Sequence, residues 1–96
     1  MRPSEALAKN RDAILDIVLA HHASNPRVFG SILSGEDTDS SDLDLLVDAT
    51  PTMTLLDVGA IRYKLREMLG ISVDVLTPRA LPAAFRDRVL ADAIPI

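Results

Sequence analysis

The sequence predicts an α/β (α+β) fold, in which helices pack against a small β-sheet. Two observations lead to this expectation. Segments with helical periodicity alternate with short strand-like segments in the order α-β-(α)-β-α-β-α. Hydrophobic residues make up 48% of the 96 residues, enough for one modest core. No internal repeat, linker or low-complexity segment interrupts this order, so we expect one domain over residues 1–96.

The first element is a helix predicted over residues 4–22. Leu7, Ile14 and Val18 recur near the helical period, and charged residues lie mostly away from that stripe. Residues 24–26, Ser-Asn-Pro, are predicted to end the helix and begin a turn.

The second element is a short strand over residues 27–29 that stops at Gly30. Residues 31–34 allow one helical turn, and residues 35–41 read as an acidic polar loop. A second strand is predicted over residues 41–48, because apolar and acidic side chains alternate there.

A long helix is predicted over residues 55–69. Thr54 and Asp57 are spaced as in a capping box at its start, and Gly70 is a natural C-cap. Its expected apolar face consists of Val58, Ile61, Leu65 and Met68.

The last two elements are a third strand over residues 71–76 and a final helix over about residues 82–92. Thr77-Pro78 ends the strand. Phe85 and Val89 are expected to point inward from the helix.

Composition excludes several classes of function. The net charge of −4 argues against a nonspecific nucleic-acid binder, and three aromatic residues are too few for a base-stacking platform. The absence of cysteine excludes disulfides and thiolate metal sites. No apolar run approaches the roughly 20 residues that span a bilayer, and no signal region is evident. We therefore expect a soluble, cytoplasmic protein without membrane contact.

Two carboxylates interrupt the most strand-like segment. Because strand side chains alternate, Asp42 and Asp44 point to one side, and Leu43, Leu45 and Val47 point to the other. Two unpaired carboxylates are costly to bury, so this part of the face is either open to water or close to a positive group. Paired carboxylates suit Mg²⁺ or Mn²⁺.

The third strand adds one acidic residue. Asp74 lies opposite in face to Val73 and Val75. If the second and third strands are neighbours, Asp74 joins Asp42 and Asp44, and three carboxylates on one face make a two-metal site plausible.

The other acids of this region have a simpler interpretation. Residues 37–48 resemble a calcium loop in part, but Asp42 replaces the glycine required at the sixth position and Leu45 occupies the ninth. We interpret the remaining acids as solvated surface, namely Glu36, Asp37, Asp39 and Asp48.

Gly30-Ser31 stands between the first strand and the helical turn. Such a pair lets backbone N–H groups approach an anion, although a lone Gly-Ser is usually just a turn. A phosphate held there, beside metal-binding carboxylates, would suit phosphoryl or nucleotidyl transfer.

The combined motif is more specific than its parts. Gly30-Ser31, ten residues and then Asp42-x-Asp44 resembles the GS-x10-DxD signature of the polymerase-beta-like nucleotidyltransferase superfamily. Over almost its whole length the chain is similar to the minimal nucleotidyltransferase domains of bacteria and archaea, including its ending, FRDRVLADAIPI. The resemblance implies a small mixed sheet with helices packed on it.

The resemblance also implies roles for individual residues. Gly30 and Ser31 would hold the β- and γ-phosphates of ATP. Asp42 and Asp44 would ligate Mg²⁺ or Mn²⁺. Asp74 would be the third catalytic acid, completing the metal site and deprotonating the acceptor hydroxyl.

Minimal domains of this kind often accompany a HEPN-domain toxin and act as its antitoxin, some by transferring AMP to a tyrosine of the toxin. The resemblance therefore implies a HEPN partner, neutralised by AMP transfer or by binding alone. One departure bears on that choice. Many members read GSRARG, and here Ile32 and Ser34 replace the two arginines, leaving metal as the main neutraliser of phosphate charge.

The remaining basic residues admit two interpretations. They would contact an acidic partner or RNA, or they form a solvated basic surface. They are Arg62, Lys64, Arg66, Arg79, Arg86 and Arg88.

Overall fold

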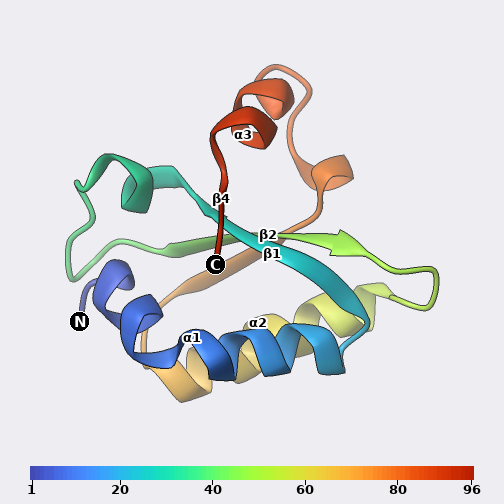
Figure 1. Cartoon of the computed structure of the whole chain (residues 1–96), viewed down its shortest axis with the longest axis horizontal. Helices are drawn as coiled ribbons and strands as arrows, with labels where there is room; N and C mark the ends of the chain where they lie inside the picture. The colour runs from blue at the N-terminus through green and yellow to red at the C-terminus, as the bar shows by residue number, and fades with distance from the viewer.

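The computed structural model describes residues 1–96 and contains a four-stranded sheet with the strand order β3-β2-β1-β4 (Figure 1). The elements are α1 (Pro3–Ala20), β1 (Ala23–Phe29), the 3₁₀ turn η1 (Gly30–Ser34), β2 (Leu43–Ala49), α2 (Leu55–Leu69), β3 (Val73–Leu76), the 3₁₀ turn η2 (Pro78–Ala80), α3 (Arg86–Asp92) and β4 (Ile94–Pro95). The predicted α+β class and alternating order are confirmed.

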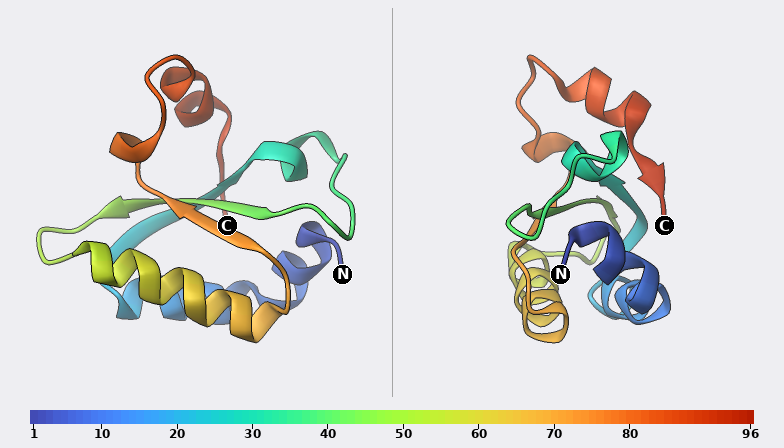
Figure 2. Two further views of the ribbon diagram at one scale, coloured as in Figure 1. Left: turned by 180° about the vertical axis from the view of Figure 1, so that it is seen from behind. Right: turned by 90° about the vertical axis from the view of Figure 1, so that its left-hand side faces the viewer.

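The sheet is mixed. β1 is antiparallel to both β2 and β4, whereas β2 and β3 are parallel and joined through α2. Helices α1 and α2 lie side by side under one face of the sheet, and η1, η2 and α3 lie on the other side (Figures 1 and 2). The two faces are therefore covered very differently.

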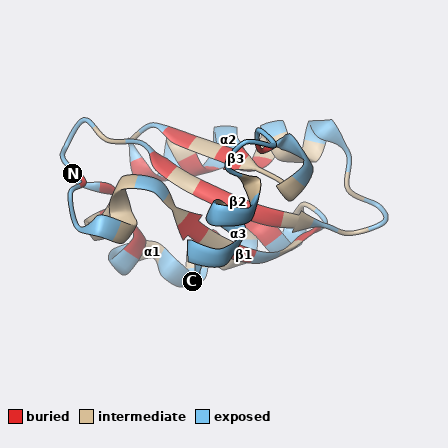
Figure 3. Ribbon diagram, turned by 90° about the horizontal axis from the view of Figure 1, so that it is seen from above, coloured by how far each residue is buried: buried red, intermediate tan, exposed pale blue.

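The main core lies between the sheet and the pair α1/α2. Leu43, Leu45 and Val47 of β2 are fully buried there, as the alternation predicted. Figure 3 shows the same alternation as bands of buried and partly buried residues along the strands. From the helices, this core receives mainly Ala6, Leu7, Ile14, Val18, Ile61, Leu65 and Leu69.

Helix α2 begins and ends at the predicted residues. The Asp57 N–H donates to Oγ1 of Thr54, and the Thr54 N–H donates to Oδ2 of Asp57 at 2.9 Å. The hydrogen bond from the Thr54 N–H holds the pKa of Asp57 below its usual value. Gly70 ends the helix with φ 69°, a conformation that favours glycine.

The turn predicted over residues 24–26 is wrong, because these residues belong to β1. The pairing with β2 shifts register between Ser24 and Arg27, and Asn25 has a positive φ of 48°. Such a bulge accommodates Pro26, which has no N–H to donate to a neighbouring strand.

Three details of the helices and the C-terminal segment also differ from the prediction. Met68 is 38% exposed and Leu69 takes its place in the core. Helix α3 begins only at Arg86, and Phe85 is 47% exposed instead of pointing inward. The two-residue strand β4 was not predicted, because so short a segment has no periodicity.

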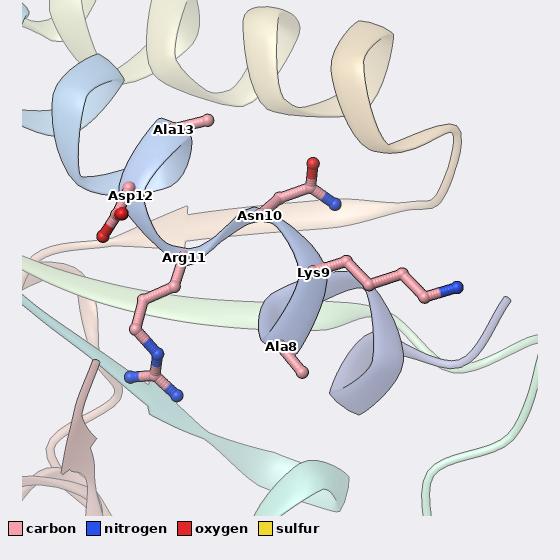
Figure 4. A pocket seen from close by; sticks show the side chains of 6 residues that line it. All are labelled: Ala8, Lys9, Asn10, Arg11, Asp12 and Ala13. Atoms are coloured by element: carbon pink, nitrogen blue, oxygen red, sulfur yellow. The ribbon is translucent and has the colours of Figure 1, made fainter.

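Helix α1 contains an unpredicted kink at Asn10, where φ is −130°. The Asn10 side chain donates from Nδ2 to the carbonyl of Ala6 at 3.0 Å, a local bond that competes with the regular helix. A surface hollow of about 500 Å³ follows the kink along residues 8–13, and Lys9 and Arg11 project from it in different directions (Figure 4).

The expectation that Asp37 is a solvated loop residue is wrong. Its side chain is only 6% exposed, and Oδ2 accepts a hydrogen bond from the Ser4 N–H at 2.9 Å. Ser4 lies in the first turn of α1, where backbone donors have no partner within the helix. This hydrogen bond holds the pKa of Asp37 below its usual value. The acidic loop thus anchors the start of α1.

None of the helices combines the length and the apolar character needed to cross a lipid bilayer.

Candidate active site

Two of the predicted acids are direct neighbours in the sheet. Asp44 of β2 pairs with Asp74 of β3 in the parallel register, and both side chains are partly buried. Their strand neighbours Leu43, Leu45 and Val73 point to the core on the opposite face. The sequence predicted this shared face, and the parallel pairing of β2 with β3 brings the two carboxylates together.

Asp42 lies one residue before β2, which begins at Leu43 and not at residue 41. Leu43 donates its N–H to the carbonyl of Ser72 at 2.9 Å, and this bond fixes the entry of the strand. Asp42 itself is exposed. It therefore stands at the solvent end of the same acidic group as Asp44 and Asp74.

The electrostatics of Asp44 indicate that the three carboxylates interact. Partial burial, with the negative charges of Asp74 and then Asp42, raises the pKa of Asp44 to about 6. An ionised Asp44 is thus disfavoured by its desolvation and by two like charges. A nearby cation would relieve both.

The three carboxylates nevertheless do not form a ready-made metal cluster. The structure contains no group of three or more His, Cys, Asp or Glu side chains arranged to hold a metal ion. The donor chemistry still fits Mg²⁺ or Mn²⁺, because these cations prefer carboxylate oxygens and keep several waters, so they need few protein ligands. Such a cation would also reduce the repulsion between Asp44 and the two neighbouring carboxylates.

Gly30 is shaped by its contact with Asp44. Its φ is +82°, and a Cβ atom built there would overlap Oδ2 of Asp44 and lie 3.3 Å from Cγ. A side chain at position 30 would therefore push the carboxylate away. The motif that joins Gly30 to Asp44 in the sequence corresponds to direct packing of the two residues.

The turn η1 follows Gly30 and was predicted as one helical turn. The Ser31 hydroxyl makes no hydrogen bond within the protein, whereas Oγ of Ser34 donates to the Ser31 carbonyl at 3.1 Å. Ile32 is partly buried against the core, and Ser34 is exposed. The Ser31 hydroxyl is thus free to bind a ligand, and no cation lies on η1.

A second hollow, of about 350 Å³, lies between η1 and α3. On the η1 side it is lined by Gly30, Leu33 and Ser34, beside Phe29 of β1. From the segment of α3 it is lined by Phe85, Arg88, Val89 and Asp92. Sequence reasoning missed this hollow. The signal was present, because the four residues from the α3 segment have the spacing i, i+3, i+4, i+7 of one helix face.

Several basic residues donate hydrogen bonds within the fold. Arg62 and Arg66 of α2 both donate through Nε to the carbonyl of Val73 at 3.2 Å. Arg86 donates from Nη2 to the carbonyls of Arg79 and Leu81. These arginines hold the connections around β3 and η2.

Besides Asp37, one more acid that was expected to be solvated surface has different surroundings. Asp48 accepts hydrogen bonds from Arg27 and from Asn25 on β1, so the expectation of simple solvation is wrong for it. Glu36 and Asp39 are exposed, as expected. The segment from residue 37 onward leads into β2 and not into a helix, so it is not a calcium-binding EF-hand loop.

By its architecture the molecule is an α+β domain with an acidic group at one end of the parallel strand pair β2-β3. Its residues 12–96 match the family model described as a nucleotidyltransferase domain. The chain belongs to this nucleotidyltransferase domain family.

Proteins of similar sequence carry related names. A Methanocaldococcus jannaschii protein, provisionally named a protein adenylyltransferase, is 36% identical over 86% of this chain and 89% of its own length. Protein adenylyltransferase MntA of Thermococcus cleftensis is 33% identical over 70% of this chain and 68% of its own length.

Solved structures resemble the fold. A structure described provisionally as a minimal nucleotidyltransferase superposes with a TM-score of 0.85 at 41% identity, covering 97% of this chain and 95% of that one. A toxin–antitoxin structure with AMP-PNP superposes with a TM-score of 0.74 at 22% identity, covering 90% of this chain and 71% of that one. At this lower identity the likeness shows the fold alone.

Proposed function

We propose that this protein transfers AMP from ATP to a hydroxyl group of a partner protein, in a reaction that depends on Mg²⁺ or Mn²⁺. The observation that carries the proposal is the pairing of Asp44 with Asp74 in adjacent strands, next to Gly30 and with Asp42 at the open end. The family to which the chain belongs and the names of its relatives support a transferase.

The proposed ligands of the metal are Asp42 and Asp44, with Asp74 contributing to a second position. When bound there, the metal would supply positive charge to the α-phosphate and to the departing pyrophosphate. Gly30 allows the carboxylate of Asp44 to lie against the backbone, and Ser31 offers a free hydroxyl to the β- and γ-phosphates. These residues would orient the triphosphate toward the acidic end of the sheet.

The proposed role of Asp74 is to accept the proton of the acceptor hydroxyl. The hydroxyl oxygen then attacks the α-phosphorus, the bond to the β-phosphate breaks, and pyrophosphate leaves with its electron pair. Asp74 suits this role because it is partly buried at the edge of the sheet while Asp42 and Asp44 carry the metal.

The proposed acceptor is a HEPN-domain toxin, with this protein as its antitoxin. Relatives named protein adenylyltransferase, and structures of toxin–antitoxin complexes with the same fold, support a protein acceptor. Helix α3, on the same side of the sheet as the acidic group, is short and contributes no buried residue. A partner surface would complete the site.

A second candidate function is favoured by one observation. Ile32 and Ser34 leave η1 without positive charge, and Ile32 packs partly into the core. A protein that binds nucleotide poorly would still neutralise a toxin by forming a stable complex. This alternative is a non-catalytic antitoxin of the same fold.

One experiment separates the two functions. The protein is incubated with labelled ATP, Mg²⁺ and the product of the neighbouring gene, and the partner is examined by intact mass. The enzyme proposal predicts a mass increase of one AMP on the partner that EDTA abolishes. A stable, inhibited complex without any added mass would instead establish the binding-only antitoxin.

A further inference from the structure

The proposed nucleotide site contains many negative charges, and η1 supplies no positive charge to balance them. The acidic group contains three carboxylates, and Asp92 adds a fourth acid at the edge of the neighbouring hollow. A nucleoside triphosphate would bring further negative charge. Electrostatic complementarity therefore favours a basic side chain close to Gly30 in addition to any metal.

Arg88 is the basic residue that the fold places there. We infer that Arg88 of α3 binds the phosphates of the nucleotide in the hollow between η1 and α3, an inference that rests on the nucleotide-dependent function proposed above. Arg88 shares this hollow with Gly30 and Ser34, so η1 and Arg88 line the same space.

The hydrogen bonds of most other arginines support this assignment. Five of the seven donate to a carboxylate or a carbonyl of the protein, namely Arg2, Arg27, Arg62, Arg66 and Arg86. Arg11 and Arg79 make no such bond, but neither lines the hollow. Arg88 has no hydrogen bond and no ion pair within the chain, not even with Asp92 one helical turn later. Its planar guanidinium is free, and phosphate is a ligand that such a group binds through two parallel hydrogen bonds.

The walls of the hollow suit the rest of a nucleotide. Leu33 and Val89 are partly buried, and Phe85, which also lines the hollow, is 47% exposed. Large apolar side chains around a few polar groups are typical of small-molecule sites, and about 350 Å³ lies within the usual range of volumes. An apolar wall next to one arginine fits a nucleoside bearing phosphates better than it fits free phosphate.

The test measures binding and not turnover. The probe is AMP-PNP with Mg²⁺, titrated by calorimetry into wild type, Arg88→Gln and Arg11→Gln. Arg11 lies on α1, and α1 is on the opposite side of the sheet from α3 (Figures 1 and 4). Its replacement changes the net charge equally. We expect Arg88→Gln to weaken binding about tenfold, the size of one lost charge-assisted contact, and Arg11→Gln to leave it unchanged.

A rescue variant distinguishes phosphate binding from a general effect on α3. Ser34 is exposed on the opposite wall of the hollow, so Ser34→Arg on the Arg88→Gln background returns a guanidinium to the same space. We expect the double variant to recover most of the lost affinity. Equal binding by wild type and Arg88→Gln would overturn the inference, as would equal weakening by Arg11→Gln.

The same titrations separate failure of this inference from failure of the proposed function. If wild type binds AMP-PNP and transfers AMP, and Arg88→Gln does both equally well, the transferase function is supported and the role of Arg88 is refuted. If wild type binds no AMP-PNP, the transferase function and the role of Arg88 are both refuted, and the binding-only antitoxin is the remaining proposal.

Discussion

The same strands present core residues on one face of the sheet and the acidic residues of the candidate site on the other. On the face toward α1 and α2, Leu43, Leu45 and Val47 are fully buried. On the other face, Asp44 and Asp74 are only partly buried. The elements on that side of the sheet are the short segments η1, η2 and α3 (Figure 2). Because side chains alternate between the two faces of a strand, residues that stabilise the core and residues of the candidate site occupy alternate positions. Substitutions at neighbouring positions should therefore have different effects.

The largest expected effect is on the buried face. Leu43→Asp places an unpaired charge in the core, so we expect the free energy of unfolding to fall by about 4 kcal/mol or more, enough to unfold much of the protein. Urea unfolding followed by circular dichroism measures this loss. Asp42→Asn, one position away and exposed, is the control and should change the stability by less than about 0.5 kcal/mol. A greater loss in the control would reverse the assignment of the faces.

The next effect is on turnover and not on stability. Asp74→Asn should lower transfer of AMP to the partner by about 10²–10⁴-fold, because an amide cannot accept the proton of the acceptor. Binding of ATP should be largely retained, since Asp42 and Asp44 still carry the metal. Intact-mass kinetics and calorimetry check the two parts. Asp48→Asn, an acid of β2 that binds Arg27, is the control and should transfer normally.

The contact between Gly30 and Asp44 allows a matched comparison of two glycines. Both Gly30 and Gly35 have positive φ, but only Gly30 has a carboxylate against its Cα. Gly35→Ala should cost about 1–2 kcal/mol for the left-handed backbone, and Gly30→Ala at least about 1 kcal/mol more. Chemical denaturation measures both. Equal losses would mean that the approach of Asp44 does not constrain position 30.

The smallest effect concerns the pH dependence of the metal-free protein. The pKa of Asp44 is raised to about 6 in the folded state, so its ionisation above that pH opposes folding. In EDTA at pH 7.5, Asp44→Asn should be more stable than wild type by about 1–2 kcal/mol, a figure reduced for solvent screening. The gap should narrow as the pH falls from about 7 to 4. A gap independent of pH would contradict the assignment.

The sequence predicted those features that depend on local periodicity. The burial of Leu43 and Leu45, the capping box at Thr54, and the C-cap at Gly70 follow from patterns within a few residues. The adjacency of Asp44 and Asp74 required one further condition, that their strands be neighbours, and the structure supplies it. These predictions succeeded because period-two alternation leaves little freedom once a strand is buried on one side.

The features that the sequence did not predict depend on tertiary pairing. Pro26 remains within β1 only because a bulge shifts the register against β2. Asp37 is buried because the chain returns it to the start of α1, 33 residues away. Leu46 is buried on the carboxylate face, outside the main core cluster, so that face is not simply open to water. None of these contacts leaves a periodic signal in the sequence.

Because α3 contributes no buried residue, the part of the hollow that it lines should open often. A seven-residue helix without a buried residue can open locally at small free-energy cost, whereas α2 opens only with the core. Amide protons of α3 should therefore exchange with solvent far sooner than those of α2. A ligand bound between η1 and α3 would slow that exchange. Slower hydrogen exchange of the α3 amides would therefore indicate that the hollow is occupied.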